Sequence, residues 1–468
     1  MTCWRSVCWL ALLAPLFPQL SLQSQCQLQD ETRPRLFVLS DIANEPDDAQ
    51  SLVRLMAYAN EFRIEGLVAT TSIWLNDTTR PDLMHEIVDA YGESLPNLQL
   101  HATGWPEAKE VKKLIASGLP LYGIGKDSSG SKLLVEAALW HVNATRSASE
   151  IENFVSKLRA YSISDQDNSG TWIRRHWPQL FYIASVHHFN LYAVAAWGGM
   201  SGEAYYHFPC EADNELVSPE WVKKNIQTSG ALGSKYPDVE FIMEGDTPSL
   251  LYMIPTGLSD PEHPDWGSWG GRYGPVTFGE GHIADSVDTL VDSEGRTIMG
   301  SHITIWRWRE AFQKDFAASM KWTVTPKFSN ANHAPVAVVN GDPGHHVIEL
   351  EVEAGEAIIL DASDSCDPDG QQLSFKWWQY REPSSHNNTP KRDVAELHIR
   401  NPDSALTTVI IPPDEILRRP GRNAHPESNK HLHLILEVSD GELVSYRRVI
   451  FTIPGPGAES PKKTHDEL

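Results

Sequence analysis

The fold of this chain is decided by the stretch Ser40-Asp41-Ile42-Ala43-Asn44-Glu45-Pro46-Asp47-Asp48. An apolar run, residues 36–39, comes directly before it, and apolar residues recur at helical spacing over residues 49–56 after it. A compact apolar run predicts a buried strand, whereas a spacing of three and four residues predicts a helix. The stretch is therefore expected to be the loop between a strand and a helix.

The same alternation continues to about Trp322. Each predicted helix separates two short apolar runs, as in units of strand, helix and parallel strand with a right-handed crossover. We predict an α/β domain over residues 33–328, built on a parallel sheet. Further strands are expected at residues 64–70, 98–101, 159–163, 180–184 and 241–243, and further helices at residues 81–91 and 150–158.

The sequence changes character after residue 335. Short β-rich runs are separated by Gly, Pro and Asp, and no long helical pattern interrupts them. This pattern is typical of an antiparallel β-sandwich of the immunoglobulin type, which we predict over residues 335–455. Four aspartates leave two interpretations open, a calcium site or ordinary turns between strands; they are Asp361, Asp364, Asp367 and Asp369.

Both ends of the chain carry sorting signals. Residues 1–25 contain one positive charge, then an apolar run, then a polar stretch, which is the layout of a cleaved signal peptide. Residues 456–468 form a tail that ends in His465-Asp466-Glu467-Leu468, a signal read by the receptor for retrieval to the endoplasmic reticulum. We expect a protein retained in the lumen of the endoplasmic reticulum, with secretion as the alternative.

Composition agrees with that compartment. Asn76, Asn143 and Asn387 stand in N-glycosylation sequons. Signal removal leaves three of the five cysteines, without the spacing of a zinc site, so at most one disulfide is expected. A formal net charge of -23 argues against nucleic-acid polymers and anionic membranes as partners. No later segment is long and apolar enough for membrane insertion once the signal is removed.

Four carboxylates crowd the opening stretch, namely Asp41, Glu45, Asp47 and Asp48. Capping of the helix start would explain Asp47 and Asp48, but Asp41 and Glu45 add charge that capping does not require. Crowded carboxylates repel one another unless a cation or protons intervene, and hard divalent cations prefer oxygen ligands. We therefore predict a cation site, for calcium or magnesium.

Two more acidic groups follow predicted strands. Asp165 and Asp167 come after residues 159–163, and Glu244 and Asp246 come after residues 241–243. Because ligands bind at the carboxyl ends of the strands in open parallel sheets, the three acidic groups are expected to converge on one crevice. For Asp165 and Asp167, a solvated loop is the open alternative.

The order of strand, Asp41, Asp47-Asp48 and helix resembles the N-terminal signature of nucleoside hydrolases. Longer matches are YSISDQD at residues 161–167, FIMEGDTPS at 241–249 and DPEHPDWGSWGGRY at 260–273. With them the chain resembles the secreted nucleoside-hydrolase-like proteins often labelled cellulose-binding, which carry a C-terminal immunoglobulin-like domain. The resemblance implies a calcium-dependent attack of water on the anomeric carbon of a glycosyl group, with the ion held by Asp41, Asp47, Asp48 and Asp246.

Two features depart from the pattern of that family. Ala43 stands where nucleoside hydrolases have the aspartate that binds the metal and acts as general base, so Asn44 or Glu45 would have to substitute. Residues 132–138 run directly into residues 139–145, where relatives are expected to have a strand that ends in a Trp-Gly-Gly turn near the metal. A mis-spliced chain is the alternative to a true loss of this strand.

The remaining predictions concern the reaction and the sugar. Asp41 or Glu45 is expected as the base, and His263 as the proton donor to the leaving group, although a histidine between prolines is also a common turn residue. Substrate contacts are expected from Asn44, Asp165, Asp167, Glu244, Trp266 and Trp269, the two tryptophans by stacking on a sugar ring. Core packing is expected for Trp306, Trp308, Trp377 and Trp378.

Two functions follow from these observations. The first is a hydrolase that cleaves glycosyl bonds, N-glycosyl bonds above all, with a divalent cation and an activated water. The second is a carbohydrate-binding or cellulose-binding lumenal protein that keeps the fold without turnover. The acidic cluster favours the first, whereas Ala43 and the short central segment favour the second. The sequence contains no nucleophile elbow, phosphate-binding loop or metalloprotease helix.

Overall fold

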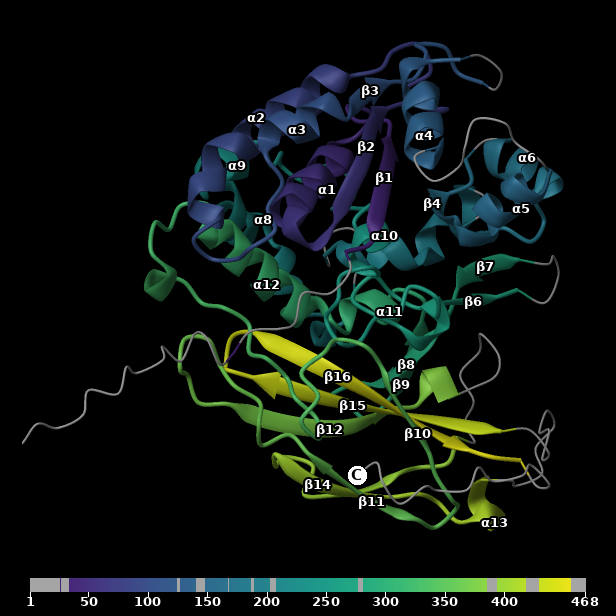
Figure 1. The fold of residues 1–468 in the computed structure, drawn as a ribbon, viewed down its shortest axis with the longest axis vertical. Coiled ribbons are helices and arrows are strands. Elements are labelled where there is room, and N and C mark those ends of the chain that lie inside the picture. Colours follow the sequence, from purple (N-terminus) through teal and green to yellow (C-terminus); the bar gives the residue numbers. More distant parts are fainter. Residues whose placement is uncertain are drawn as a thin grey trace, which may run out of the picture.

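The computed structural model describes Cys26 and residues 33–123, 127–139, 148–166, 168–186, 189–202, 208–276, 281–384, 394–417 and 429–455. An α/β part, from β1 to η9, is followed by a β part, from β10 to β16 (Figure 1). The predicted fold class, a parallel-sheet α/β region before a smaller all-β region, is confirmed. The immunoglobulin type of the β part stays a prediction.

The first sheet carries the opening stretch. β1, Arg35–Ser40, precedes α1, Pro46–Ala57, as predicted. β1 pairs in parallel with β2, Arg63–Ala69, and β2 pairs in parallel with β3, Ile115–Ser117. Apolar residues of these elements and of α2, Pro81–Leu98, make the largest core of the molecule. The other helices here are η2 Ala59–Glu61, α3 Ala108–Lys113, α4 Ser129–Leu139 and α5 Ala148–Lys157.

A second sheet has the strand order β4-β5-β7-β6. β4, Arg159–Ser164, β5, Phe181–Val186, and β7, His282–Asp285, are parallel, and β6, Tyr273–Pro275, is antiparallel to β7. Among the described residues no pairing joins β1 to β4, so the parallel strands of the α/β part are divided between two sheets where one was expected.

Further helices and one hairpin complete the α/β part. They are α6 Ser169–His176, η3 Phe189–Val194, η4 Ala196–Met200, η5 Cys210–Ala212, η6 Asn214–Val217, α8 Pro219–Val222, η7 Lys223–Gln227, α9 Gly230–Gly233, α10 Pro248–Leu251, η8 Pro264–Trp266, β8 Asp288–Val291, β9 Thr297–Gly300, α11 Ile303–Trp306, α12 Arg309–Trp322 and η9 Phe328–Asn330.

Two predicted strands are not strands in the structure. Residues 98–101 end α2 and turn, because Leu95 and Leu98 continue the buried face of that helix. Residues 241–243 form a bend with one isolated bridge. Phe241 there has φ 61° and is 65% exposed, so it neither adopts an extended backbone nor packs into a sheet.

The β part has two sheets, ordered β10-β16-β15-β12 and β11-β14-β13. Its pairings are antiparallel except that β10 runs parallel to β16. Asp361 and Asp367 accept backbone N–H bonds within their own turns, as the turn interpretation of the aspartates expects. The elements are β10 Ile348–Glu351, β11 Ala357–Asp361, β12 Ser374–Tyr380, η10 Glu382–Ser384, β13 His398–Arg400, β14 Leu406–Ile410, α13 Asp414–Leu417, β15 Lys430–Ser439 and β16 Val444–Ile453.

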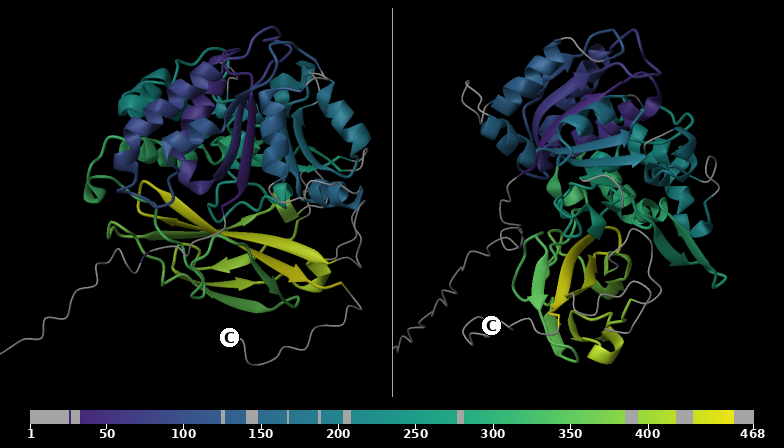
Figure 2. Two further views of the ribbon diagram at one scale, coloured as in Figure 1. Left: turned by 45° about the horizontal axis from the view of Figure 1, so that its top comes forward. Right: turned by 90° about the vertical axis from the view of Figure 1, so that its right-hand side faces the viewer.

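A buried cluster around Asp288 joins the two parts. The Asp288 carboxylate accepts hydrogen bonds from Arg272 Nε and Arg307 Nη1, each at 2.7 Å, and from the Tyr380 hydroxyl of β12 at 2.6 Å. Arg448 of β16 donates to two backbone carbonyls of the α/β part. The sheet that contains β16 faces the α/β part (Figure 2). Charged and aromatic groups therefore hold the two parts together.

Cys26 forms a disulfide with Cys366, and Cys210 is exposed and not disulfide-bonded. Residues 1–25 and 456–468, with the predicted sorting signals, lie outside the described residues, as do the sequons at Asn143 and Asn387. The third sequon residue, Asn76, is exposed. No helix in the described ranges has the length and apolar character that a membrane crossing requires.

Candidate metal centre

Hydrogen bonds hold the acidic loop in shape. The Ser40 hydroxyl, at the end of β1, donates to Asp48 Oδ1 over 2.5 Å and accepts from the backbone N–H of Ile42. The Asn44 N–H donates to the Asp41 carbonyl over 3.0 Å. The Ile42 side chain is fully buried and anchors the loop. These contacts set the first turn of α1, with Asp48, against the carboxyl end of β1.

Asp246 reaches the same place from the turn before α10. Glu244 in that turn is fully buried and accepts a hydrogen bond from Arg54 Nε of α1 at 2.6 Å. A Cβ at Gly245 would lie 2.8 Å from Asp47 Oδ2, so a side chain at this position would displace the Asp47 carboxylate. The ion pair and the close approach of the backbone together bring Asp246 to the acids of α1.

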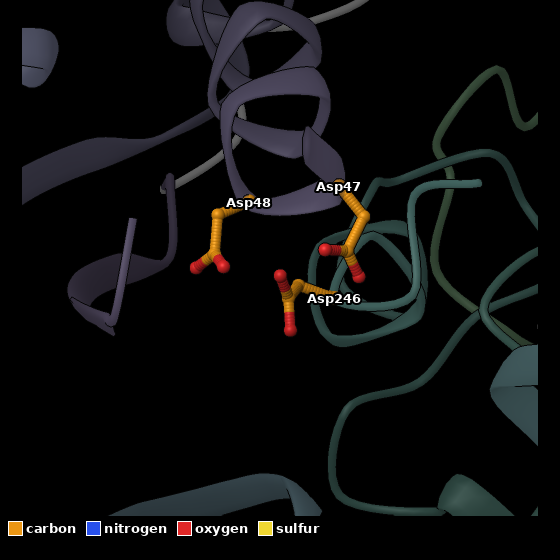
Figure 3. A group of neighbouring side chains, drawn as sticks. All are labelled: Asp47, Asp48 and Asp246. Atoms are coloured by element: carbon orange, nitrogen blue, oxygen red, sulfur yellow. The ribbon is translucent and has the colours of Figure 1, made fainter. Parts of the chain in front are cut away.

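Asp47, Asp48 and Asp246 turn their carboxylates toward one another (Figure 3). One oxygen from each lies within 4.8 Å of the others. Among the residues with described positions, this is the only such group of three or more His, Cys, Asp or Glu side chains. Asp47 and Asp48 are buried and Asp246 is partly buried, so bulk water screens their charges poorly.

The three carboxylates line a cavity of about 290 Å³. It lies where the carboxyl ends of β1 and β4 meet, the position at which open α/β sheets bind ligands. The other lining residues are Asp41, Asn44, Glu45, Trp74, Ile163, Ser164, Gln166, Tyr192, Trp197, Ile242 and Gly245.

Burial raises the pKa of all three aspartates, and neighbouring carboxylates raise it further. The pKa of Asp47 reaches about 7, with Glu45 and Asp41 as the charges that add to burial. The pKa values of Asp48 and Asp246 also rise well above the ordinary aspartate value, from burial first and then from the other acids of the cluster. The charges that act on these groups are other carboxylates rather than Lys or Arg, so a cation would relieve the repulsion.

The donor set fits a hard divalent cation, because three carboxylate oxygens lie close enough to share one ion. Of the four predicted ligands, Asp47, Asp48 and Asp246 converge, and Asp41 lines the same cavity. The Asp41 charge acts on all three of these aspartates and raises the pKa of Asp48 more than any other neighbouring carboxylate does.

Asn44 and Glu45, predicted as substrate contact and base, both line the cavity. Asp165 does not, because its carboxylate accepts hydrogen bonds from Arg174 at 2.5 Å and from the Tyr182 hydroxyl at 2.9 Å. Asp167 lies outside the described residues. Glu244, predicted as a substrate contact, does not line the cavity and is fully buried in its pair with Arg54.

His263, Trp266 and Trp269 lie at the contact between the two parts, not at the cavity. The His263 ring stacks on Trp266 with 3.9 Å between centroids, and Trp266 meets His433 of β15 edge to face. Trp269 is buried and packs against Tyr446 of β16. None of the three lines the cavity: His263 is exposed, Trp266 is partly buried and Trp269 is buried.

Aromatic residues that sequence reasoning missed do line the cavity. Trp74, in the loop after β2, is 57% exposed, whereas Trp197 of η4 is buried, and Tyr192 of η3 completes the set. Trp197 begins a Trp-Gly-Gly sequence beside the acids, but it comes from η4 and not from a strand after residue 138. Trp306, Trp308 and Trp377 are buried, as expected of core residues.

Two protein-family models match this chain. The model for "Cellulose-binding Sde182, nucleoside hydrolase-like domain" matches residues 35–138 and 135–273, and that for "Cellulose-binding protein Sde0182, C-terminal domain" matches residues 357–453. No curated protein matches the chain in sequence.

A solved structure is similar over nearly the whole chain. It is a nucleoside hydrolase-related hypothetical protein from Saccharophagus degradans, described as associated with carbohydrate metabolism. It is 31% identical, with a TM-score of 0.69 over 90% of this chain and 100% of its own. An endo-fucoidan hydrolase of glycoside hydrolase family 107 matches 28% of this chain and 15% of its own chain at 14% identity. Its TM-score of 0.16 is too low to indicate a shared fold. By the family model and the bacterial structure, the chain belongs to the Sde182 nucleoside hydrolase-like family, whose name carries the cellulose-binding label.

Proposed function

We propose that this protein is a hydrolase that cleaves the glycosyl bonds of small glycosides, N-glycosides among them, with the help of a divalent cation. The observation that carries the proposal is the convergence of Asp47, Asp48 and Asp246 on one cavity of a nucleoside hydrolase-like fold. The carbohydrate association of the similar bacterial protein supports a sugar as ligand. Calcium is the proposed ion, because magnesium is usually held by only one or two carboxylates.

A bound cation would lower the pKa of a water molecule and hold sugar hydroxyls. The chain itself supplies the other groups. Glu45 lines the cavity, and burial together with the Asp41 charge raises its pKa, which suits a general base. Asn44 offers an amide to a sugar hydroxyl, and Trp74 offers an exposed ring face to the sugar. Glu45 would thus act as the general base in place of Ala43, whose side chain cannot accept a proton.

Tyr192 is proposed in place of His263 as the proton donor to the leaving group. Tyr192 lines the cavity, and burial raises the pKa of its phenol, which therefore stays protonated at neutral pH. A neutral phenol donates a hydrogen bond to an oxygen or nitrogen of the leaving group. His263 does not line the cavity.

Carbohydrate binding without turnover is the second candidate function. It is favoured by one specific observation, which is that the position of the family's base carries Ala43, a side chain without any proton-accepting group. The cellulose-binding label of the family agrees with it. Binding alone would need the cavity and its aromatic rim but not Glu45.

Cation titration combined with a substrate panel separates these functions. We expect millimolar calcium to raise the melting temperature of the wild-type protein and to support release of sugar from nucleosides or aryl glycosides. Asp246→Asn should abolish both effects. Asp82→Asn is the matched control: Asp82 follows a proline in the first turn of α2, as Asp47 does in α1, but it is exposed and away from the cavity.

Each other outcome has a definite meaning. A calcium-dependent melting shift and sugar binding without any product would establish the binding function. An absence of the calcium shift in the wild-type protein, or an equal loss in both variants, would reject the metal centre.

We also propose that the protein resides in the lumen of the endoplasmic reticulum, on the strength of residues 1–25 and His465-Asp466-Glu467-Leu468. Removal of the last four residues should send the protein into the culture medium, whereas the full chain should stay inside the cell. Equal secretion of both would reject retention.

A further inference from the structure

η4 carries one aromatic wall of the acidic cavity. Of its residues Trp197 alone lines the cavity, and the Trp197 indole meets the Tyr192 ring edge to face with 5.3 Å between centroids. A Cβ at Gly245 would lie 3.7 Å from Trp197 Cε3, so the indole also lies beside the turn that carries Asp246. The position of η4 therefore sets the shape of the cavity and the place of Tyr192, the proposed proton donor.

Apolar packing offers little to hold η4 in one position. The segment from Ala195 to Met200 is buried, but Ala195, Ala196, Gly198 and Gly199 have small side chains or none. The hydrophobic effect is not directional, and small groups have few atoms that can interlock with their neighbours. Hydrogen bonds are directional, so they are the contacts that can fix the segment.

Asp285, the last residue of β7, holds the start of η4. Its Oδ2 accepts a hydrogen bond from the Ala196 N–H over 2.7 Å, and its Oδ1 accepts one from the Ser185 hydroxyl of β5 over 2.7 Å. Burial raises the pKa of Asp285 to about 7, whereas these two hydrogen bonds lower it. No Lys or Arg of the described ranges forms an ion pair with Asp285. One carboxylate thus joins η4 to two strands of the second sheet.

Arg309 of α12 holds the other end of η4. Its Nη2 donates hydrogen bonds to the carbonyls of Gly199 and Ser201, each over 2.6 Å. The side chain is fully buried, and burial lowers its pKa to about 9. The charge of Asp213 opposes this shift, but within the part of the chain that the structure describes Arg309 has no ion pair.

The two charges match the ends of η4. The anion lies at an N–H of the first turn and the cation lies at carbonyls of the last, which is the favourable polarity for a helical segment. A buried charge without an ion partner lowers stability, however, and folding alone would be served by apolar neighbours. An arrangement that lowers stability and ends at a ligand cavity indicates a functional role.

We propose that Asp285 and Arg309 are positioning residues, which fix η4 so that Trp197 and Tyr192 present one defined wall to the ligand. The proposal rests on the proposed function, because the ligand is taken to be a glycoside. Without Asp285 the wall should shift, and the substrate should bind more weakly. The cation centre should persist, because Asp47, Asp48 and Asp246 belong to α1 and to the turn before α10.

Two substitutions at Asp285 test the proposal. Asp285→Ala removes both acceptors and should raise the KM for a nucleoside or aryl glycoside about tenfold, with the calcium-dependent melting shift retained. Asp285→Asn should leave KM within about twofold, because its amide can accept from the Ala196 N–H and donate to the Ser185 hydroxyl. A smaller population of folded protein would lower kcat and leave KM unchanged, so KM separates positioning from a loss of fold.

Hydrogen exchange gives a second measurement that needs no substrate. Residues 192–200 should exchange faster in Asp285→Ala than in the wild-type protein, and Asp285→Asn should restore their protection. The matched control is Asp292→Ala, because Asp292 also accepts backbone N–H bonds, in the turn between β8 and β9, and does not line the cavity. It should change neither KM nor the exchange of residues 192–200.

Each contrary result has a definite meaning. An unchanged KM in Asp285→Ala, or an equal defect in the Ala and Asn variants, would overturn the proposal. If the wild-type protein releases no sugar, the proposed hydrolase fails, and exchange alone decides: equal exchange of residues 192–200 in both variants would overturn the positioning role. If Asp285→Ala does not fold, Ser185→Ala replaces it, since it removes one of the two bonds; unchanged exchange there would overturn the proposal too.

Discussion

Glu244 and Asp246 are two residues apart, and the groups that face them decide their roles. The Glu244 carboxylate accepts two hydrogen bonds from the Arg54 guanidinium and is fully buried. Asp246 faces Asp47 and Asp48 instead, so its charge is opposed rather than balanced. A buried acid that is paired braces the fold, whereas a buried group of acids without a counter-charge offers the ligands that a cation could use.

Glu244→Gln should destabilise the protein by about 3–5 kcal/mol, because it leaves the Arg54 charge buried without its partner. Denaturant unfolding would measure the loss. The matched control is Glu65→Gln, which breaks a more exposed pair with Arg35 and should cost less than about 1 kcal/mol. Equal costs would mean that Glu244 does not brace the turn before α10.

Ala43→Gly should stabilise the protein by about 1 kcal/mol. Ala43 has φ 88°, a backbone conformation that costs a residue with a Cβ about 1–3 kcal/mol, while glycine adopts it freely at some entropic cost in the unfolded state. Ala43→Val should have the opposite effect, since a β-branched residue tolerates this conformation least. A lower unfolding free energy for the glycine variant would show that the loop is not strained at this position.

At the scale of elements, α1 and the turn before α10 build the candidate site together. α1 supplies Asp47 and Asp48 from its first turn, and Arg54 two turns later holds Glu244 in the opposite wall. The strands contribute their ends, so the cavity depends on how the two sheets are placed. Helices and strands of this fold therefore contribute to the candidate site through the residues at their ends, and to the core through their buried faces.

β1 and β2 should respond differently to the same truncation. Leu67→Ala, at a fully buried position of β2, should cost about 2–5 kcal/mol of unfolding free energy, the range for a leucine removed from a packed core. Leu39→Ala, in β1, should cost less than about 1 kcal/mol, because Leu39 is mostly exposed. A cost at Leu39 close to that at Leu67 would show that something covers the edge of β1 in solution.

His302, at the start of α11, makes that element sensitive to acid. Burial against neighbours such as Phe208 lowers its pKa to about 4 from an ordinary 6.5. The unfolded chain thus binds a proton between these pH values while the folded protein does not, so stability is full above pH 6.5 and falls as pH drops toward 4. The loss should reach about 3 kcal/mol and should be smaller in His302→Gln, as measured by unfolding at pH 7 and pH 4.5. Parallel pH profiles for the two proteins would exclude His302 as the cause.

At the scale of the whole molecule, the β part is joined to the α/β part by buried polar groups. The loop of residues 260–273, whose tryptophans looked suited to a sugar, is the surface on which β15 and β16 rest. Gly267 allows the close approach, since a Cβ there would lie 2.7 Å from the Tyr380 hydroxyl. The β part thus braces the larger part at some distance from the cavity.

Asp288→Asn should weaken this junction. Because the substitution removes the charge that balances Arg272 and Arg307, the free energy of unfolding should fall by about 3–5 kcal/mol. Calorimetry should show two separate unfolding transitions for the variant, where the wild-type protein has one. Asp403→Asn, in an exposed turn of the β part, serves as control and should change neither stability nor cooperativity. A single transition in the Asp288 variant would show that the junction does not depend on this carboxylate.

The sequence alone determined the order of strands and helices in most of the chain, the change to an all-β region and the acidic loop at the end of the first strand. These features depend on the spacing of apolar residues and on turn residues within short windows, which can be read without tertiary contacts. Tertiary structure alone decided which acids converge, that Glu244 is paired and that Trp269 is buried. The physical reason is that charge balance and burial depend on residues far apart in the chain, as with Arg54 and Glu244, 190 positions apart.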